Sequence, residues 1–296
     1  MSWRTVVITK RAKLDLKTGF LVIRTEEDTR RVFLDELSVL IIENPMVSVT
    51  GCLITALSEK KIKVIICDEK RSPSCELVSY YGSHDCADRI RKQIKWNEDA
   101  KACVWTEIVT EKIRNQATFL EKIKKDKEAK LIKSYLSQIE IKDATNREGH
   151  AAKVYFNALF GLDFTRSMDC IINAALNYGY GIILSAFNRE IVSHGYITQI
   201  GLYHNNMFNN FNLSCDLMEP FRVLVDKKVY FSGFNQFMSE EKHTMVGLLN
   251  DTVMINNTQQ TVLNAVKIYC QSIFDAIEEN DMSKIKFYST GELGDI

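Results

Sequence analysis

Two acidic residues and one histidine lie within a short stretch of the C-terminal half of the chain. His204 precedes an Asn-rich segment, NNMFNNFNLS, that lacks helical periodicity, and the next expected helix has Asp216 and Glu219 in its first turn. A spacing of three residues places both carboxylates on one face of that helix. Carboxylates with a single imidazole suit manganese or magnesium better than zinc. These three residues are therefore candidates for a divalent metal site.

Asp216 has a simpler interpretation, and Glu219 does not. The helix dipole favours acidic residues in a first turn, so Asp216 is equally well explained as an N-cap or first-turn residue. Glu219 lies within an apolar stretch, LMEPF, where a buried carboxylate needs a positive partner or a metal. The sequence therefore favours a chemical role for Glu219 more strongly than for Asp216.

A further acidic residue, Glu148, begins an amphipathic helix in the segment NREGHAAKVYFNALFG. A glutamate at a helix start is commonly a capping or dipole residue, and the local sequence alone leaves that interpretation open. His150 points about 200° around the helix from Glu148, because each residue advances by about 100°. We therefore expect His150 on the surface or near a phosphate, and not as a metal ligand.

The apolar segment INAALNYGYGIILSAF contains amide and phenol side chains. Its composition predicts a core helix whose amides are satisfied internally. Amides on such a helix can also contact phosphates, so that alternative stays open. The side chains concerned are Asn173, Asn177, Tyr178 and Tyr180.

Several classes of function are excluded by missing signatures. The chain has no GxGxxG, GxxxxGK[ST], GxSxG or HExxH motif, which excludes a P-loop hydrolase and a zincin protease. The eight cysteines are widely spaced without a CxxC pair, so neither a zinc site nor a disulfide framework is indicated, and a reducing compartment is expected. No apolar run approaches the ~20 residues of a membrane span. We expect a cytoplasmic protein without a membrane segment.

The patterning predicts an α+β protein of two domains. A small N-terminal β-rich domain is expected over residues 1–75, with one helix that follows Thr50 as a possible cap. The segment 76–87 breaks both periodicities and is expected to be a linker. A larger all-α domain is expected over residues 88–296, because 3.6-residue periodicity dominates there. Only 13 glycines and 3 prolines among 296 residues agree with a helix-rich chain.

The overall charge is balanced, with 38 basic and 38 acidic residues, but residues 86–148 contain 15 basic and 11 acidic residues. The overall balance removes the simplest argument for nucleic acid as a partner. The family resemblance described next implies that basic residues in this region and beside the candidate ligands contact DNA phosphates. For Arg222, a salt bridge to Asp226 at i, i+4 is the alternative. The run KIKKDKEAK at 122–130 is interpreted as a solvated helix face, and a nucleic-acid contact is the less favoured alternative. The candidate DNA-binding residues are Arg89, Arg91, Lys92, Lys95, Arg147, Lys153 and Arg222.

Four motifs in order resemble one known family. REGHAAKVYF, NAALNYGYGIIL, GLYH and CDLMEPFR follow one another as in the CRISPR-associated integrases ("Cas-one"), which insert new spacers into a CRISPR array. Each motif alone is a weak signal, but four in order are specific. The segments HDCADRIRKQIKW and SYYG resemble the subgroup that accompanies type II-A systems.

The resemblance implies a metal site and a reaction. It implies that Glu148, His204 and Glu219 are the metal ligands and catalytic residues, with Mg²⁺ or Mn²⁺ as cofactor, and that Asp216 supports these ligands from behind or binds a second metal. Many relatives have Asp at the position of Glu219, and Tyr196–Ile197–Thr198 replaces a usual Asp or Asn followed by Pro. The implied reaction is metal-dependent transesterification that joins the 3′-OH ends of short DNA fragments to CRISPR repeat boundaries, with endonuclease activity when water attacks.

The resemblance also implies partners. These are double-stranded DNA with 3′ ends, CRISPR repeat DNA, a second copy of the chain bound through the β-rich domain, and a small ferredoxin-like protein, "Cas-two", in a heterohexamer. Other type II-A adaptation proteins and the effector nuclease are further expected partners. The alternatives are a catalytically silent DNA-binding scaffold of the same fold and an unrelated helical enzyme.

Overall fold

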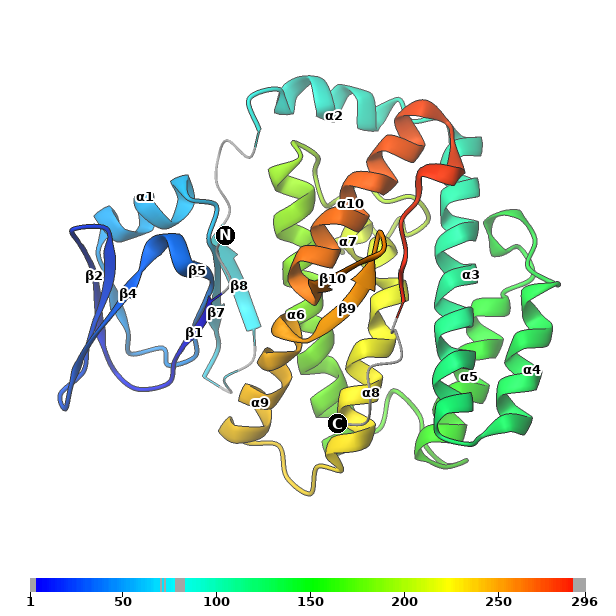
Figure 1. Cartoon of the computed structure of the whole chain (residues 1–296), viewed down its shortest axis with the longest axis horizontal. Coiled ribbons are helices and arrows are strands. Elements are labelled where there is room, and N and C mark those ends of the chain that lie inside the picture. Colours follow the sequence, from blue (N-terminus) through cyan, green and yellow to red (C-terminus); the bar gives the residue numbers. More distant parts are fainter. Residues whose placement is uncertain (1–3, 70, 72, 78–82, 290–296) are drawn as a thin grey trace. The chain divides into compact units, whose positions relative to one another are not determined.

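The computed structural model describes residues 4–69, 71, 73–77 and 83–289 (Figure 1). The chain forms two compact units: residues 1–86 with 192–195, and residues 87–191 with 196–296. The middle of the expected linker, residues 78–82 with the SYYG segment, lies outside the described residues. So do residues 290–296 at the C-terminal end.

The first unit contains two four-stranded sheets among its described residues. In one sheet the first three strands are parallel and the last is antiparallel; in the other only the last pair is parallel. The first sheet has the order β1 (Arg4–Ile8), β5 (Leu37–Ile42), β7 (Lys63–Cys67), β8 (Pro73–Leu77). The second has the order β4 (Thr29–Phe33), β3 (Phe20–Arg24), β2 (Lys13–Lys17), β6 (Ser48–Val49).

Both sheets of the first unit contribute to one hydrophobic core with helix α1 (Gly51–Glu59). Strand β5 is buried at every position, as expected of a central strand covered on both faces. Leu40 of β5 shares the core with Leu14 and with Leu53 of α1. Thr50 is the residue before α1, as predicted, but its side chain makes no capping hydrogen bond. The β-rich region with its helix is thus confirmed.

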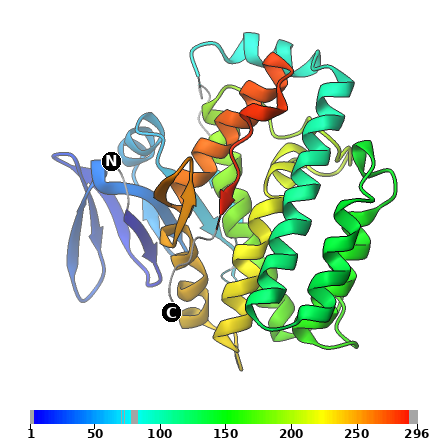
Figure 2. The same ribbon diagram turned by 45° about the vertical axis from the view of Figure 1, so that its right-hand side comes forward.

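The second unit is mainly helical, as predicted (Figures 1 and 2). Its α-helices are α2 (Cys86–Ile94), α3 (Glu98–Lys122), α4 (Asp126–Leu136), α5 (Arg147–Phe160), α6 (Ile171–Ser193), α7 (Asn212–Leu217), α8 (Arg222–Ser232), α9 (Ser239–Val246) and α10 (Val262–Glu279). Short 3-10 turns are η1 (Leu34–Glu36) in the first unit and η2 (Ile141–Asp143), η3 (Glu219–Phe221), η4 (Gly247–Asn250) and η5 (Met282–Lys284) in the second.

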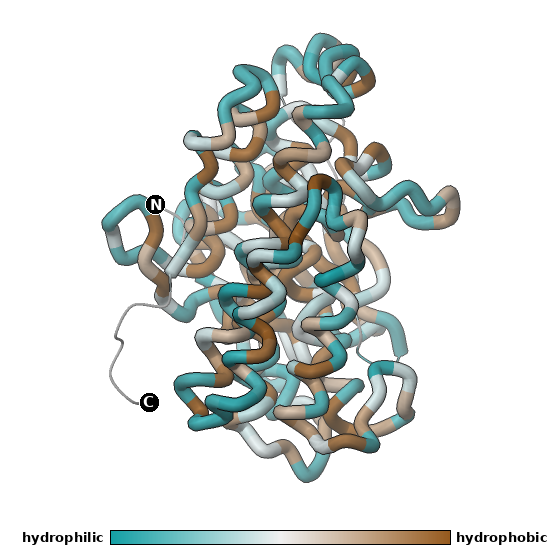
Figure 3. The backbone as a smooth tube through the Cα atoms, turned by 90° about the vertical axis from the view of Figure 1, so that its right-hand side faces the viewer, coloured by the Kyte–Doolittle hydropathy of each residue, from teal (hydrophilic) through white to brown (hydrophobic). Residues whose placement is uncertain are grey.

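Helix α3 is the longest helix and connects the elements that carry the candidate ligands. Its N-terminus is capped by Asn97, whose side chain accepts from the backbone N–H groups of Asp99 at 2.7 Å and Ala100 at 3.2 Å. It packs against α4, α5, η3, α8 and α10. On the side formed by α3, α4 and α5, hydrophobic and hydrophilic residues alternate along the helices (Figure 3), which is the pattern of amphipathic helices around a core.

The second unit is not all-α, which corrects the prediction for residues 88–296. A three-stranded antiparallel sheet has the order β10 (Thr258–Thr261), β9 (Thr252–Ile255), β11 (Tyr288–Ser289). Asn256 and Asn257 join β9 to β10 with φ values of 52° and 59°, and such left-handed pairs make tight hairpin turns. Residues 258–261, within the region expected to be all-α, therefore form a strand, and helix α10 begins at Val262, where the Thr261 hydroxyl accepts from Asn264 N at 3.2 Å.

In the part of the chain that the structure describes, no helix combines the length and apolar character needed to span a bilayer. The eight cysteines, all of them described, are free thiols.

Candidate functional site

Glu148 is positioned by the first turn of α5. The Asp143 carboxylate accepts from the backbone N–H groups of Arg147 at 2.8 Å and Glu148 at 3.0 Å, and so caps this helix. Asp143 is buried. Both Asp143 and Asn146 have left-handed backbone conformations, with φ values of 52° and 51°. Because Asp143 satisfies these donors, the Glu148 side chain is available to face α3. The capping interpretation of Glu148 is thus replaced by a contact with another helix.

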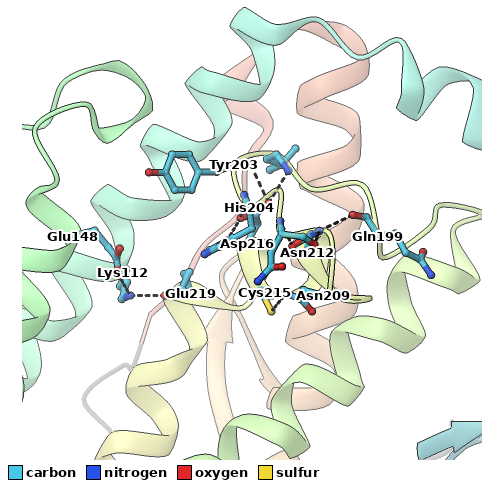
Figure 4. Close-up of polar contacts among 12 residues, drawn as sticks. Lys112, Glu148, Gln199, Tyr203, His204, Asn209, Asn212, Cys215, Asp216 and Glu219 are labelled. Carbon is cyan, nitrogen blue, oxygen red and sulfur yellow. Dashed lines mark hydrogen bonds and ion pairs between the residues drawn. The ribbon is translucent and has the colours of Figure 1, made fainter. Parts of the chain in front are cut away.

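Glu219 begins η3, between α7 and α8, and is buried. The Lys112 ammonium, in the middle of α3, binds both Glu148 Oε1 and Glu219 Oε2 (Figure 4). The other oxygen of Glu219, Oε1, accepts from Arg222 Nε at 2.8 Å. The sequence predicted a positive partner or a metal for a buried Glu219, and the chain itself provides two positive partners.

The charges of this cluster stabilise one another. Burial alone would raise the pKa of the Glu219 carboxyl, but Arg222 and Lys112 outweigh it and lower the pKa to about 2. Burial alone would lower the pKa of Lys112, but Glu219 and Glu148 outweigh it and raise the pKa. Lys112 and Glu219 are therefore both charged near neutral pH.

His204 is oriented by Asp216 of α7. Asp216 is completely buried, and its Oδ1 lies 2.5 Å from His204 Nδ1 and accepts from His204 N at 3.1 Å. Its Oδ2 accepts from the backbone N–H groups of Leu202 at 2.6 Å and Tyr203 at 3.0 Å. A proton on Nδ1 facing the carboxylate leaves the Nε2 lone pair of His204 available to a ligand.

The hydrogen bond to Asp216 is the largest influence on the pKa of His204 and raises it, whereas burial lowers it less. The charges of Glu219 and Glu148 also raise this pKa. The side chain of His204 is 41% exposed. The structure thus brings Glu148, His204 and Glu219 into one neighbourhood, with His204 open to solvent (Figure 4).

Gly201 explains the GxxH spacing. A Cβ atom at Gly201 would lie 2.5 Å from the carbonyl oxygen of His204 and 2.7 Å from Asp216 Oδ2. Asp216 Oδ2 also accepts from the backbone N–H groups of Leu202 and Tyr203, and the carbonyl oxygen belongs to the backbone of His204 itself, so a shift of either atom would disturb the loop. A residue without a side chain is therefore required three positions before the histidine.

The Asn-rich segment after His204 is ordered by its own amides. Asn212 is buried, and its Nδ2 donates to the carbonyl oxygens of Gln199 and Asn206, at 3.0 Å each. Asn206 Oδ1 accepts from Phe208 N at 2.9 Å. The side chains of Phe208 and Met207 are left largely exposed. The amides thus replace regular secondary structure in holding the His204 loop.

The structure corrects the expected geometry of Asp216 and Glu219. Helix α7 begins at Asn212, so Asp216 is not an N-cap or first-turn residue, and α7 ends before Pro220, as helices usually do. Asp216 binds the loop backbone, whereas Glu219 faces Lys112. The two carboxylates do not share a ligand-binding face; Asp216 lies behind His204.

A divalent metal fits the donor types of this site. Two carboxylates already converge on one cation, the Lys112 ammonium, and an oriented imidazole lies beside them. Among the described residues, no group of three or more His, Cys, Asp or Glu side chains is arranged to hold a metal as it stands. The ammonium lies between the carboxylates, so metal binding by Glu148, His204 and Glu219 requires a local rearrangement.

Arg222 and Asp226 belong to one buried network, but they do not form the i, i+4 salt bridge considered as the alternative. Arg222 pairs with Glu219 and lies over the Tyr180 ring, 4.7 Å from its centroid. The Tyr180 hydroxyl donates to Asp226 Oδ1 at 2.5 Å. Burial raises the pKa of Asp226 to about 6. Arg222 therefore supports Glu219 directly.

The amides of α6 are satisfied largely within the protein. Asn173 Nδ2 donates to the carbonyl oxygens of Thr165 at 2.9 Å and Met168 at 2.8 Å. Arg166 binds the Oδ1 atoms of Asn173 and Asn177. The core-helix interpretation of Asn173 is confirmed.

The candidate DNA-binding residues differ in their surroundings. Arg89 pairs with Glu278 at 2.7 Å and donates to the Tyr196 hydroxyl at 3.2 Å, so it is engaged in a structural contact. Arg147 lies 5.8 Å from the centroid of the Tyr135 ring. The exposed members of the set are Arg91, Lys92, Lys95 and Lys153. His150 is also exposed, as predicted.

Sequence reasoning did not identify Lys112 or Asp143. Lys112 is one of several lysines in the basic helices, and its partners lie 36 and 107 residues away along the chain. Asp143 is five residues before Glu148 in a turn of left-handed residues that has no simple pattern. Glu219 offered the one available signal, since a glutamate in an apolar stretch requires a positive partner.

Comparisons with known proteins agree with this architecture. The family model described as "CRISPR associated protein Cas1" matches residues 5–267. The "CRISPR-associated endonuclease Cas1" of Neisseria meningitidis serogroup C (strain 8013) is 35% identical over 229 residues, which cover 77% of this chain and 75% of that protein.

Solved structures of low sequence identity share the fold. A casposase bound to integration product matches with a TM-score of 0.76 at 16% identity, over 100% of this chain and 96% of the other. A chain of a Cas6-RT-Cas1–Cas2 complex matches with a TM-score of 0.74 at 17% identity, over 99% of this chain and 36% of the other. The family match over most of the chain and the N. meningitidis relative show that this chain belongs to the Cas1 family of CRISPR-associated proteins.

Proposed function

We propose that this chain is a metal-dependent DNA integrase and endonuclease of CRISPR adaptation. In this proposal it joins the 3′-OH ends of short DNA fragments to CRISPR repeat boundaries. The observation that carries the proposal is the convergence of Glu148 and Glu219 on one cation, beside an imidazole that a buried Asp216 orients. The N. meningitidis relative is named an endonuclease, and the casposase structure is described as bound to integration product.

Glu148, His204 and Glu219 are the residues that would hold Mg²⁺ or Mn²⁺. When bound, such a cation supplies charge neutralisation at the scissile phosphate and favours the deprotonated form of the attacking hydroxyl. Asp216 keeps the proton of His204 on Nδ1, so that Nε2 stays a lone-pair donor. The proposed role of Asp216 is therefore to position His204, and not to bind a second metal.

The reaction exchanges one phosphodiester for another. The 3′-hydroxyl of the fragment attacks the phosphorus at the repeat boundary and loses its proton. The bond from phosphorus to the 3′ oxygen of the cut strand breaks, and that oxygen leaves and takes up a proton. Attack by water instead gives hydrolysis, which is the endonuclease reaction. Arg222, held against Glu219, contributes positive charge near the phosphate.

DNA is proposed to be held along its backbone by exposed basic residues near α2 and α5. Arg91, Lys92 and Lys95 are exposed on or just beyond α2, and Lys153 is exposed on α5. Arg89 is not proposed for this role, because its half-buried side chain binds both Glu278 and Tyr196. Lys92 also pairs with Asp88, but its side chain is 51% exposed. Binding through phosphates weakens steeply with salt and is largely independent of sequence.

Assembly with a Cas2 protein is part of the proposal. One structure that shares the fold is described as a Cas6-RT-Cas1–Cas2 complex. We propose that two homodimers of this chain flank a dimer of a small ferredoxin-like partner, with the β-rich unit as the homodimer surface, and that the protein acts in the cytoplasm.

The proposal is tested by incubating the chain and its Cas2 partner with a DNA fragment carrying free 3′ ends, a repeat-containing plasmid and Mn²⁺, with and without chelator, and by measuring DNA binding and joined product. Joined product that requires Mn²⁺ is expected. The Glu148→Gln variant is expected to lose joining, because one ligand charge is removed while the side-chain shape is kept.

The outcomes separate the rival functions. DNA binding without joining, with the Cas2 partner present, would favour a catalytically silent scaffold. Joining that persists in chelator, or in the Glu148→Gln variant, would contradict the proposed site.

A further inference from the structure

Lys112 places its ammonium between two of the proposed metal ligands, Glu148 and Glu219. Its side chain rises from the middle of α3, is 7% exposed, and binds one oxygen each of Glu148 and Glu219. These two residues come from α5 and η3, so the ammonium joins three elements that are distant in sequence. Removing water from two carboxylates is costly unless a cation compensates them. Lys112 provides that compensation for Glu148 and Glu219.

The electrostatics do not favour a divalent cation in addition to the ammonium. Arg222 already binds the second oxygen of Glu219, so the two carboxylates face two positive charges from the chain. A cation of charge +2 in the same position would repel the Lys112 ammonium strongly at such short range. The long, flexible stem of lysine allows the ammonium to withdraw, whereas the Arg222 contact uses a different carboxylate oxygen.

We propose that Lys112 is an internal counter-ion that a divalent cation displaces from Glu148 and Glu219, so that metal loading is an exchange of cations. This inference rests on the proposed function. It makes Lys112 a positioning residue. Lys112 holds the carboxylates of Glu148 and Glu219 next to each other before the metal binds, and it sets how tightly the metal binds. Monovalent ions carry too little charge to compete with a lysine already in place.

The first test compares Lys112→Met with Lys101→Met. Lys101 lies on the same helix and pairs with Glu98 at 2.8 Å, outside the site. Mn²⁺ binding is measured by electron paramagnetic resonance of the free ion. We expect Lys112→Met to bind Mn²⁺ more tightly, on the order of tenfold, because the competing charge is gone. Lys101→Met should bind as the unaltered chain does.

The same variants are compared by thermal unfolding in chelator and in saturating Mn²⁺. In chelator the Lys112→Met variant should melt several degrees below the unaltered chain, because its carboxylates lose their cation. Saturating Mn²⁺ should raise its melting temperature by more than it raises that of the unaltered chain. Lys101→Met should show neither difference.

The second test uses the unaltered chain, so that it does not depend on folding of a variant. Lysine side chains are labelled with an acylating reagent in chelator and in saturating Mn²⁺, and the labelled sites are quantified by mass spectrometry. Displacement predicts that labelling of Lys112 rises when Mn²⁺ binds. Labelling of Lys101 serves as the internal reference and should not change.

The failures are distinguishable. Mn²⁺ affinity that is equal or weaker in Lys112→Met, or Lys112 labelling that does not rise, overturns the exchange and leaves the proposed function standing. If the unaltered chain binds no Mn²⁺ at all, the proposed metal site and this inference are both overturned.

Discussion

The Asp216 carboxylate lies 2.5 Å from His204 Nδ1 and also binds the backbone N–H groups of the loop that carries this histidine. One buried side chain thus fixes both the position of the loop and the tautomer of the imidazole. The metal-binding geometry of His204 therefore depends on a residue that does not itself touch the metal in our proposal.

Asp216→Asn is expected to weaken Mn²⁺ binding by about 10- to 100-fold, because the imidazole loses the charged acceptor that orients it. The amide nitrogen also faces a backbone donor, and each buried group left unsatisfied costs about 1–3 kcal/mol of stability. Mn²⁺ titration measures the binding, urea unfolding measures the stability, and nitrogen NMR shifts of the His204 ring measure its tautomer. Asp163→Asn, at an exposed aspartate, is the control. An unchanged His204 tautomer in Asp216→Asn would argue against the positioning role.

Gly201→Ala should destabilise the His204 loop. The added methyl group meets the His204 carbonyl oxygen and Asp216 at distances that force one of them to move. We expect a loss of about 1–3 kcal/mol in the free energy of unfolding and weaker Mn²⁺ binding. Gly247→Ala is the matched control, because the nearest atom to its added Cβ is 3.9 Å away. Equal stability of the two variants would refute the close-approach argument.

Asp226 makes stability depend on pH in a defined direction. Burial raises its pKa from 3.8 to about 6, so the folded chain takes up this proton more readily than the unfolded chain does. Its contribution is therefore complete below about pH 4 and is lost as the pH rises through about 6, by at most about 3 kcal/mol. Asp226→Asn still accepts from Tyr180 but does not titrate.

We expect Asp226→Asn to lose less stability than the unaltered chain between pH 4 and pH 7, as measured by urea unfolding at each pH. Asp163→Asn, at an exposed position, should follow the unaltered chain. Parallel curves for Asp226→Asn and the unaltered chain would show that this carboxyl does not titrate in that range.

Two groups of exposed basic residues, one on or just beyond α2 and one in the 122–130 segment, are expected to differ in DNA binding. Replacing Arg91, Lys92 and Lys95 with Ala should flatten the plot of log affinity against log salt concentration by about 2–3, because each DNA phosphate that a basic side chain neutralises adds about 0.9 to the slope. Fluorescence anisotropy of a labelled duplex at several salt concentrations measures the slope. The control removes three exposed lysines of the 122–130 segment, which are Lys124, Lys125 and Lys127.

The control should keep the slope of the unaltered chain, because we interpret that segment as a solvated helix face. A larger decrease in the control than in the α2 variant would reverse the assignment of the DNA-binding surface.

The helices were predictable because their apolar positions recur at the helical period over long segments. The β9–β10 hairpin was not predicted, because its second strand, Thr258–Thr261, runs directly into helix α10. The Asn256–Asn257 pair was the available signal, since two consecutive asparagines tolerate the left-handed conformation of a tight turn. The four ordered motifs indicated the family, and the match over residues 5–267 confirms it.

The candidate site was predictable only in part. Glu148, His204 and Glu219 were identified through the motifs, and they lie in one neighbourhood, while their role as ligands stays a proposal. Lys112 could not be found, because its role depends on contacts over 36 and 107 residues and lysines are common in solvated helices. Asp216 was predicted in the first turn of a helix that also holds Glu219, whereas α7 already begins at Asn212 and ends at Leu217, before Glu219.

Three successive backbone N–H groups, from Leu202 to His204, point at one carboxylate. Such concave turns commonly capture phosphate or sulfate in other proteins. In this chain the Asp216 carboxylate accepts from all three of these amides, so they are not available to bind a DNA phosphate. In the proposed function, a DNA backbone near His204 is therefore held by side chains and by the proposed cation, and not by these amides.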